Sequence, residues 1–189
     1  MASLPLTRAA SLPDYEDCDS VAVWQQCLAI DAYHRWHRDS PTYLCDDVLC
    51  YNWGAARFRA PGANPRYRSF GDPELSLDVS AVFALSVLDR VEAPLRFLRH
   101  QVDRLMIGGL IVCTFAAWDA TGEDCAVGHE LRHRIYDRES WRKLVHEAKS
   151  LGLQPFGGVD LRYHGHALGD HTLATLVATK ERWNGSWRK

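Results

Sequence analysis

The middle of the chain holds two short apolar runs with an amphipathic segment between them. Val79 to Val87 is almost entirely apolar or small and does not alternate, which is typical of a strand buried on both faces. Leu110 to Phe115 is a second run of this kind. Between them, Pro94 stands at a favourable helix start, because the N–H group that proline lacks would have no partner there. The apolar residues that follow repeat at helical spacing: Leu95, Leu98, Val102 and Leu105.

This order of elements predicts a βαβ unit. Gly108-Gly109 is expected to end the helix, since glycine readily adopts the left-handed cap conformation. Two strands joined by a crossover helix pair in parallel, with a right-handed connection. We therefore expect an α/β fold, Rossmann-like, built on a mostly parallel sheet.

The flanking segments extend this pattern on both sides. A helix is predicted from a cap at Asp19 or Ser20 to the residue before Ser40-Pro41. Its apolar face is expected to hold Val23, Trp24, Cys27, Leu28 and Ile30. Thr42 to Tyr51 predicts one kinked strand or two short ones, and Tyr67 to Phe70 another short strand.

The C-terminal third predicts a helix followed by an antiparallel hairpin. Asp137 can cap the helix and Gly152 can end it. The apolar face of this helix holds Trp141, Leu144, Val145 and Ala148. The strands of the hairpin are predicted at Gln154 to Tyr163 and at Leu173 to Lys180.

Composition and charge indicate one ordinary globular domain. The chain has 189 residues, of which 47% are hydrophobic and 24% charged, with a net charge of −2. We predict a loose arm over residues 1–17 and a single domain over 18–189. The near-neutral charge gives no nucleic-acid signal, and no apolar run is long enough to span a membrane. The six cysteines form no CxxC pair and predict reduced thiols in a cytoplasmic protein.

Clusters of basic and histidine residues offer only weak signs of a site. Arg57, Arg59, Arg66 and Arg68 lie in or beside a turn-rich segment. They form either a solvated loop or a clamp on a carboxylate or phosphate. His34 and His37 are expected on a helix surface, and the histidines of residues 164–171 match no metal motif. We expect no metal site.

The ordered motifs from Tyr67 to Lys180 resemble class I S-adenosylmethionine (SAM)-dependent methyltransferases of the type 11-like group. The resemblance rests on a strand that opens with Asp78-Val79, the loop Ser86-Val87-Leu88-Asp89-Arg90-Val91 and the turn Arg104-Leu105-Met106-Ile107-Gly108-Gly109-Leu110. It continues through Arg134-Ile135-Tyr136, the helix from Glu139 and Leu151-Gly152-Leu153. In this family the last strand runs against the others, as the predicted hairpin would.

This resemblance implies SAM as cofactor and methyl transfer to an acceptor that the sequence does not identify. Cofactor contacts are implied for Gly71, Asp72, Ala84 and Ser86, with Asp72 near the adenine unless it belongs to a plain Asp-Pro turn. Substrate contacts are implied in the insertion between Ala116 and Arg134, which carries Trp118, His129 and His133. No catalytic residue is implied.

The N-terminal half departs from the family. The first glycine of the chain is Gly54, so no glycine-rich loop precedes Asp78. Residues 42–70 are also too few for the three strands and two helices that usually come first, so the N-terminal half is rebuilt or shortened. Thr42 to Tyr51 either replaces the first strand, or it is the second strand and the first is missing. In the second case Asp46, Asp47 or Asn52 would stand near the usual ribose-binding acid. The alternative to an enzyme is a catalytically inactive methyltransferase-like fold that acts as a binding or structural module.

Overall fold

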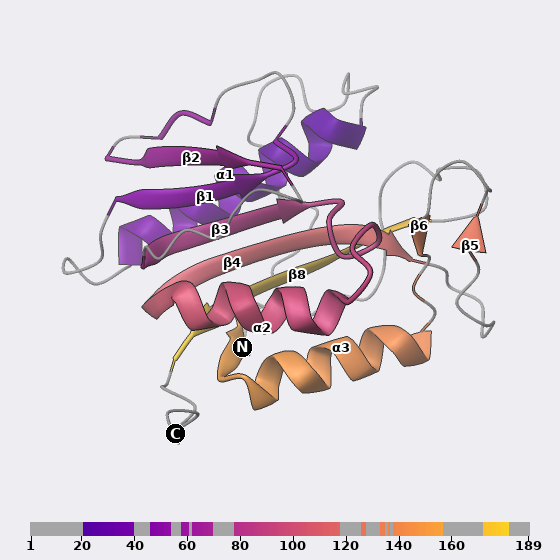
Figure 1. The fold of residues 1–189 in the computed structure, drawn as a ribbon. Coiled ribbons are helices and arrows are strands. Elements are labelled where there is room, and N and C mark those ends of the chain that lie inside the picture. The colour runs from indigo at the N-terminus through magenta and orange to yellow at the C-terminus, as the bar shows by residue number, and fades with distance from the viewer. Residues whose placement is uncertain are drawn as a thin grey trace.

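A six-stranded sheet forms the centre of the computed structural model (Figure 1). The structure describes residues 21–39, 46–53, 58–60, 62–69, 78–117, 126–127, 133–134, 136, 138–156 and 172–181. The strands of the sheet are β1 (Asp47–Tyr51), β2 (Asn64–Arg68), β3 (Val79–Leu85), β4 (Leu105–Ala117), β7 (Leu153–Pro155) and β8 (Thr172–Lys180). Their order in the sheet is β2-β1-β3-β4-β8-β7.

Three helices and a small ribbon complete the described part of the chain. The helices are α1 (Val21–Asp39), α2 (Pro94–Arg104) and α3 (Arg138–Ser150). The ribbon pairs β5 (Ala126–Val127) with β6 (His133–Arg134) in antiparallel orientation. None of the described helices is long and apolar enough to cross a membrane.

Strand directions confirm the predicted fold class. β1 pairs in parallel with both β2 and β3, and β3 pairs in parallel with β4 across the helix α2. β8 runs antiparallel to β4 and to β7, so the C-terminal hairpin is also confirmed. The result is a Rossmann-like α/β sheet, mostly parallel, with an antiparallel last strand.

The Gly108-Gly109 pair does not end the helix, and that prediction is wrong. The helix α2 ends at Arg104, and Leu105 already has an extended backbone. Both glycines lie within β4, where the pairing jumps from Val79 opposite Leu105 to Ala81 opposite Leu110. Gly108 has φ 82°, and a Cβ on Gly109 would lie 2.8 Å from the Ser80 carbonyl oxygen. The pair therefore accommodates a bulge, in which the Trp36 indole donates to the Gly108 carbonyl at 2.8 Å.

The second strand also begins earlier than predicted. β2 starts at Asn64, within the segment expected to be a basic loop, and ends at Arg68. Asn64 donates a hydrogen bond of 2.6 Å to the Asp47 carboxylate, which also lies 3.4 Å from Arg66 Nε. These contacts link the side chains of β1 and β2 where the two strands begin. The prediction treated the arginines as loop residues because charged residues and a proline weaken the strand pattern.

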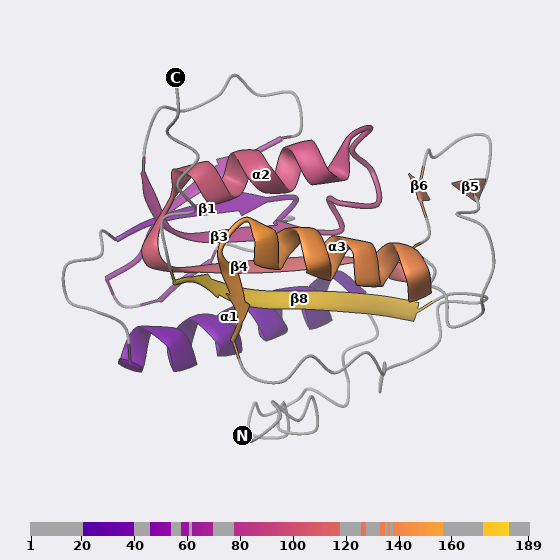
Figure 2. The ribbon, with the colours of Figure 1, turned by 90° about the horizontal axis from the view of Figure 1, so that it is seen from below.

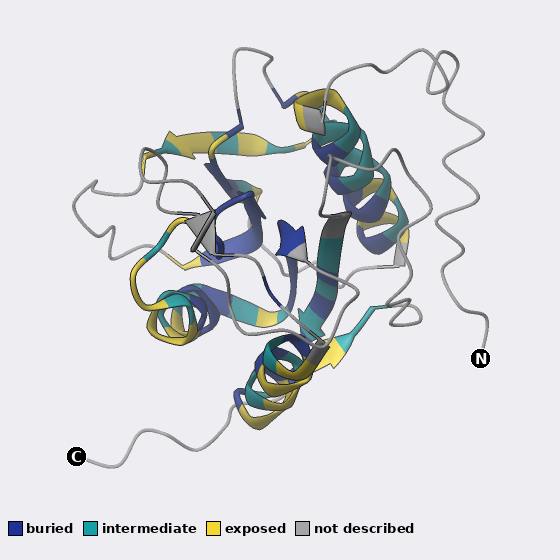
Figure 3. Cartoon of the chain, turned by 90° about the vertical axis from the view of Figure 1, so that its right-hand side faces the viewer, coloured by how far each residue is buried: buried dark blue, intermediate teal, exposed yellow. Residues whose placement is uncertain are grey.

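Helices cover the two faces of the sheet unequally. The helices α2 and α3 lie on one face, and α1 lies on the other (Figure 2). Successive residues of β3 alternate between two core clusters, Val82 and Ala84 packing with the α2–α3 side and Ala81 and Phe83 with the α1 side. Figure 3 shows the resulting pattern, with buried central strands and exposed outer helix surfaces.

The helix faces agree with the sequence prediction in α3 but not in α1. Trp141, Leu144 and Ala148 are buried as expected, and Gly152 follows α3 with φ 84°. In α1, the predicted face is wrong, because Val23 is exposed. The buried residues of α1 form a different stripe: Gln25, Ala29, Ala32, Tyr33 and Trp36. His34 and His37 are exposed, as predicted.

Described cysteines are reduced. Cys50 and Cys113 are free thiols, and burial raises the pKa of each to about 12. Thiols with such a pKa stay protonated at neutral pH and are poor nucleophiles and poor metal ligands. Within the described ranges, no group of three or more histidine, cysteine or acidic residues is placed to hold a metal ion.

Candidate functional site at the carboxyl edge of the sheet

The chain reverses its direction of sheet growth between β1 and β3. From β1 the chain continues outward to β2, whereas β3 continues to β4 on the other side. In open α/β sheets such a switch point opens a crevice at the carboxyl ends of the strands, and ligands bind there. Tyr51 lies opposite Ala84 in the pairing, so β1 and β3 end at nearly the same level. The candidate site is therefore built on the residues that follow Tyr51 and Leu85.

Both strands end in a left-handed residue. Among the described residues, the non-glycine residues with positive φ are Asn52 at 53° and Ser86 at 50°. Each is the first residue after its strand, β1 or β3. A non-glycine residue in this conformation costs on the order of 1–2 kcal/mol, and such strain is concentrated at functional sites. The sharp turns at both strand ends thus mark the switch point independently of topology.

Hydrogen bonds tie these two turns together. The Asn52 side-chain amide donates to the carbonyl oxygen of Leu85 at 2.8 Å. The backbone N–H of Ser86 donates to Thr114 Oγ1 at 2.9 Å, and Thr114 is fully buried in β4. The ends of β1, β3 and β4 are therefore held in one arrangement by side-chain bonds that the sheet itself does not require.

The helix α1 adds two more bonds from its own face of the sheet. The Gln25 side-chain amide donates to Ser86 Oγ at 2.6 Å, and Gln25 is only 4% exposed. The neighbouring Gln26 side chain donates to the carbonyl oxygen of Trp53, directly after Asn52. The first turns of α1 thus hold the loop after β1 and the loop after β3 at the same time.

On the other face, the loop after β3 carries a buried carboxylate. Asp89 is 5% exposed, and the backbone N–H groups of Arg90 and Val91 both donate to the Val87 carbonyl in a tight turn. The Tyr136 hydroxyl donates to the Leu88 carbonyl at 3.0 Å. Asp89 therefore sits in a fixed loop beside the switch point.

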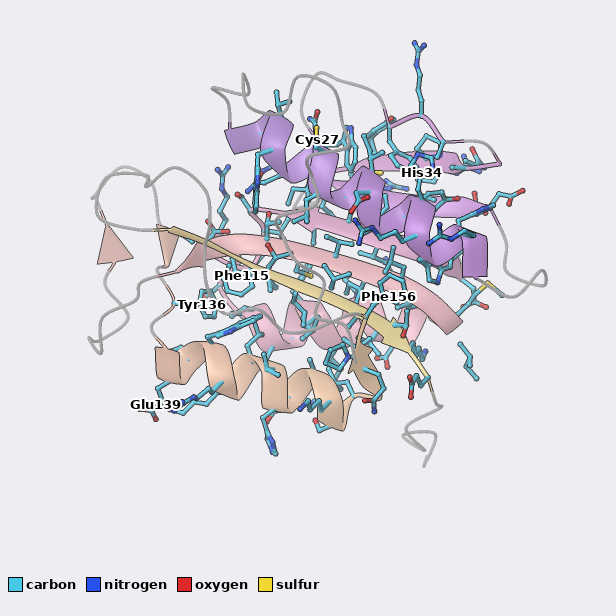
Figure 4. All side chains as sticks on the ribbon, turned by 180° about the vertical axis from the view of Figure 1, so that it is seen from behind. Cys27, His34, Phe115, Tyr136, Glu139 and Phe156 are labelled. Atoms are coloured by element: carbon cyan, nitrogen blue, oxygen red, sulfur yellow. The ribbon has the colours of Figure 1, made fainter. Side chains whose placement is uncertain are left out.

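Aromatic rings pack around the end of β4 on this face of the sheet. The Phe115 ring lies 4.8 Å from the ring of Tyr136 and 4.9 Å from that of Trp141. Figure 4 shows Phe115 and Tyr136 next to each other, close to the start of α3. All three rings are buried, so they pack the segment around Tyr136 and the start of α3 against the end of β4.

The structure describes only part of the predicted site. Ser86 lies at the switch point, whereas Ala84 is fully buried in the core on the α2–α3 side. Gly71, Asp72, Trp118 and His129 lie outside the described residues. His133 lies in β6, but its side chain is likewise outside the described part. The roles of these residues remain predictions.

Sequence reasoning missed Gln25 and Thr114, and it named Asp89 only as a member of the loop from Ser86 to Val91. A signal for Gln25 exists: it occupies the buried stripe of α1 together with Ala29, Tyr33 and Trp36, at the spacing of a core position. A glutamine there is unexpected unless it is hydrogen-bonded. Thr114 and Asp89 stand within or just after apolar runs and carry no comparable signal.

Strand pairing bears on the two alignments of the N-terminal half. β1 pairs directly with β3, which is the place of the first strand in a doubly wound sheet. A second strand without the first would also lie beside β3, so both alignments remain predictions. In the first alignment, the segment that follows β1 stands where a glycine-rich loop is usual, and here it begins with Asn52 and the buried Trp53.

Comparisons with known proteins give a match only at the level of structure. No protein-family model and no curated protein matches the sequence. A SAM-dependent methyltransferase from Clostridium acetobutylicum superposes with a TM-score of 0.52 at 9% identity, over 90% of this chain and 96% of that one. The chain has the fold of class I SAM-dependent methyltransferases.

Two further structures with this fold give the same result. The N-terminal domain of EvdMO1, solved with S-adenosylhomocysteine (SAH) and D-fucose, has a TM-score of 0.53 and 11% identity, over 86% of this chain and 84% of that one. The CurJ carbon methyltransferase reaches 0.58 at 12% identity, over 87% of this chain but only 56% of its own. Identities this low establish the fold and leave substrate and activity open.

Proposed function

We propose that this protein is a SAM-dependent methyltransferase that binds SAM at the carboxyl ends of β1 and β3. The observation that carries the proposal is the pair of left-handed turns at Asn52 and Ser86, bonded together at the switch point of a methyltransferase fold. The methyl acceptor is not identified by any described residue. Structural neighbours solved with SAH support the choice of cofactor.

The groups around the switch point suit such a ligand. SAM carries a positive sulfonium and ammonium group, hydroxyls and a carboxylate. The Asp89 carboxyl group lies in the loop that follows β3, and the hydroxyl of Ser86 and the amide oxygen of Asn52 offer hydrogen bonds. Within this arrangement, no large side-chain movement is needed to present these groups, because the turns are already fixed.

The chemistry asks little of the protein beyond positioning. When bound, SAM supplies a methyl group that the positive sulfur has already activated. The acceptor's lone pair forms the new bond to the methyl carbon while the carbon–sulfur bond breaks and its electron pair returns to sulfur. If the acceptor carries a proton, that proton passes to solvent or to a base. The chain's task is to hold methyl and acceptor in line, which the bonded turns after β1 and β3 would serve.

Isothermal titration calorimetry with SAM and with SAH tests the proposal. We expect micromolar binding to the wild type and roughly tenfold weaker binding to Asn52→Ala, which loses one hydrogen bond at the switch point. Asn64→Ala is a matched control, since Asn64 is an exposed asparagine at the start of β2. Asp72→Ala tests the adenine contact predicted from the sequence.

Absence of binding up to millimolar ligand, in a protein shown to be folded, would overturn the proposed function. Equal weakening by Asn52→Ala and Asn64→Ala would move the site away from the switch point. The same titrations give both results, because Asn52 follows the end of β1 whereas Asn64 lies at the start of β2.

A further inference from the structure

We propose that Gln25 is a positioning residue that sets the direction of the Ser86 hydroxyl toward the ligand. The inference rests on the proposed function and extends it to α1, a helix outside the stretch from Tyr67 to Lys180 whose sequence motifs resemble methyltransferases. The ligand group that the Ser86 hydroxyl would contact is a hydrogen-bond acceptor, such as a carboxylate or hydroxyl oxygen of SAM or SAH.

The position of Gln25 argues against a role in packing alone. Its side chain is 4% exposed and belongs to the apolar stripe of α1, next to Ala29 one turn later. A buried amide costs free energy unless it is bonded, and an apolar side chain would fill the same space without that cost. The bond from Gln25 Nε2 to Ser86 Oγ spans 61 positions of sequence and is 2.6 Å long.

This bond fixes the polarity of the Ser86 hydroxyl. A serine hydroxyl has one donor and two acceptor sites. Because the Gln25 amide donates to Ser86 Oγ, the hydroxyl proton of Ser86 is directed away from Gln25. The backbone N–H of Ser86 is already bonded to Thr114, so the hydroxyl cannot reorient by moving the backbone. In this proposal the O–H group faces a ligand bound at the carboxyl ends of β1 and β3.

Reversing this polarity tests the inference. In Gln25→Glu, an ionised carboxylate can only accept a hydrogen bond, so the Ser86 hydroxyl turns toward Glu and away from the ligand. A protonated carboxyl can donate again and restore the original direction. We expect SAH binding to this variant to be roughly tenfold weaker at pH 8 and to recover toward the wild-type value at pH 5.

Wild-type measurements provide the reference for pH. The described titratable groups in the loop after β3 are Asp89, Arg90 and Glu92, and along α1 the nearest are Cys27, Asp31 and His34. These groups are common to wild type and variant, so the ratio of the two dissociation constants isolates residue 25. Gln154→Glu, an exposed position on β7, controls for the added charge.

A double-mutant cycle keeps the test decisive if Gln25→Glu fails to fold. Gln25→Met removes the donor and keeps the volume, and we expect roughly tenfold weaker SAH binding at every pH. In a Ser86→Ala background the same change should have no further effect, since no hydroxyl remains to be oriented. Additive effects of the two substitutions, or a pH-independent ratio for Gln25→Glu, would overturn the inference. A wild type that does not bind SAH would overturn the proposed function itself, which separates the two failures.

Discussion

The two faces of the sheet are covered in different ways. On one face, α2 and α3 bury mainly aliphatic side chains, including Leu98, Val102 and Leu144. On the other face, α1 is the described helix, and a cluster of aromatic rings shares the cover with it. The cluster consists of Tyr33, Trp36, Trp53, Phe58 and Phe83.

The difference shows how the N-terminal half of the chain covers its face of the sheet with fewer helices. Residues 52–63 connect β1 and β2 without a helix in their described part, and from this connection Trp53 and Phe58 pack their rings against Phe83 at 5.4 and 5.2 Å. A few large rings bury as much apolar surface as a longer run of small side chains. The α2–α3 face is covered mainly by helices, and the α1 face adds aromatic packing to a single described helix.

The largest expected effect comes from the centre of the aromatic face. Phe83→Ala should destabilise the protein by about 3–5 kcal/mol, because Phe83 contacts the rings of Tyr33, Trp53 and Phe58. Phe115→Ala is the matched change on the helical face, where Phe115 has two ring neighbours. Urea denaturation should show the smaller loss for Phe115→Ala. An equal or larger loss would contradict the view that aromatic packing replaces helices on the α1 face.

A smaller effect is expected in the bulge where α1 and β4 meet. An alanine Cβ at Gly109 would lie 2.8 Å from the carbonyl oxygens of both Ser80 and Met106, which cannot move away as a flexible side chain could. Gly109→Ala should therefore cost about 1–3 kcal/mol. Gly152→Ala, at the end of α3, is the comparison on the other face and should cost about 1 kcal/mol through its φ of 84°. A Gly109→Ala variant as stable as the wild type would mean that the bulge relaxes.

The stability of the protein at alkaline pH tests whether water is excluded equally from both faces of the sheet. Cys50 packs on the α1 side and Cys113 on the α2–α3 side, and burial raises the pKa of each thiol from 9.0 to about 12. Between these values the unfolded chain releases the proton and the folded chain keeps it, so stability falls as pH rises. Each thiol should contribute about 1.4 kcal/mol of loss per pH unit above roughly pH 9.

Single alanine variants separate the two thiols. Denaturation of Cys50→Ala and of Cys113→Ala from pH 8 to 10.5 should show an equal reduction of the alkaline slope relative to the wild type. A slope unchanged by Cys50→Ala alone would indicate that water reaches the aromatic face.

Sequence patterns predicted the helical face far better than the aromatic face. The continuous apolar runs of β3 and β4 and the helical stripe of α3 are plain in the sequence, so these elements could be predicted. In α2, Leu98 and Val102 are buried as predicted, but Leu95 is exposed and Leu105 already belongs to β4, so that stripe was only partly right. Prediction from sequence patterns fails where tertiary contacts override the local conformational preference. Gly108-Gly109 suits a helix end but forms a bulge, because Trp36 and Ser80 lie against it.

The candidate site could be predicted only in part for the same reason. Ser86 follows a clear strand and was found from the family pattern. Gln25 and Thr114 meet Ser86 across 61 and 28 positions of sequence, and no local pattern encodes such pairs. The role of Asn52 depends on β1 lying beside β3, which only the pairing of the strands decides.

The most direct test of the site is a map of backbone amide chemical shifts in the ¹⁵N-labelled protein as SAH is added. The account predicts the largest changes at Asn52, Trp53 and Ser86, at the carboxyl ends of β1 and β3. Amides at the opposite ends of these strands, such as Asp47 and Val79, should hardly change. Saturable changes centred on those opposite ends, or an unchanged spectrum at millimolar SAH, would contradict a cofactor site at the switch point.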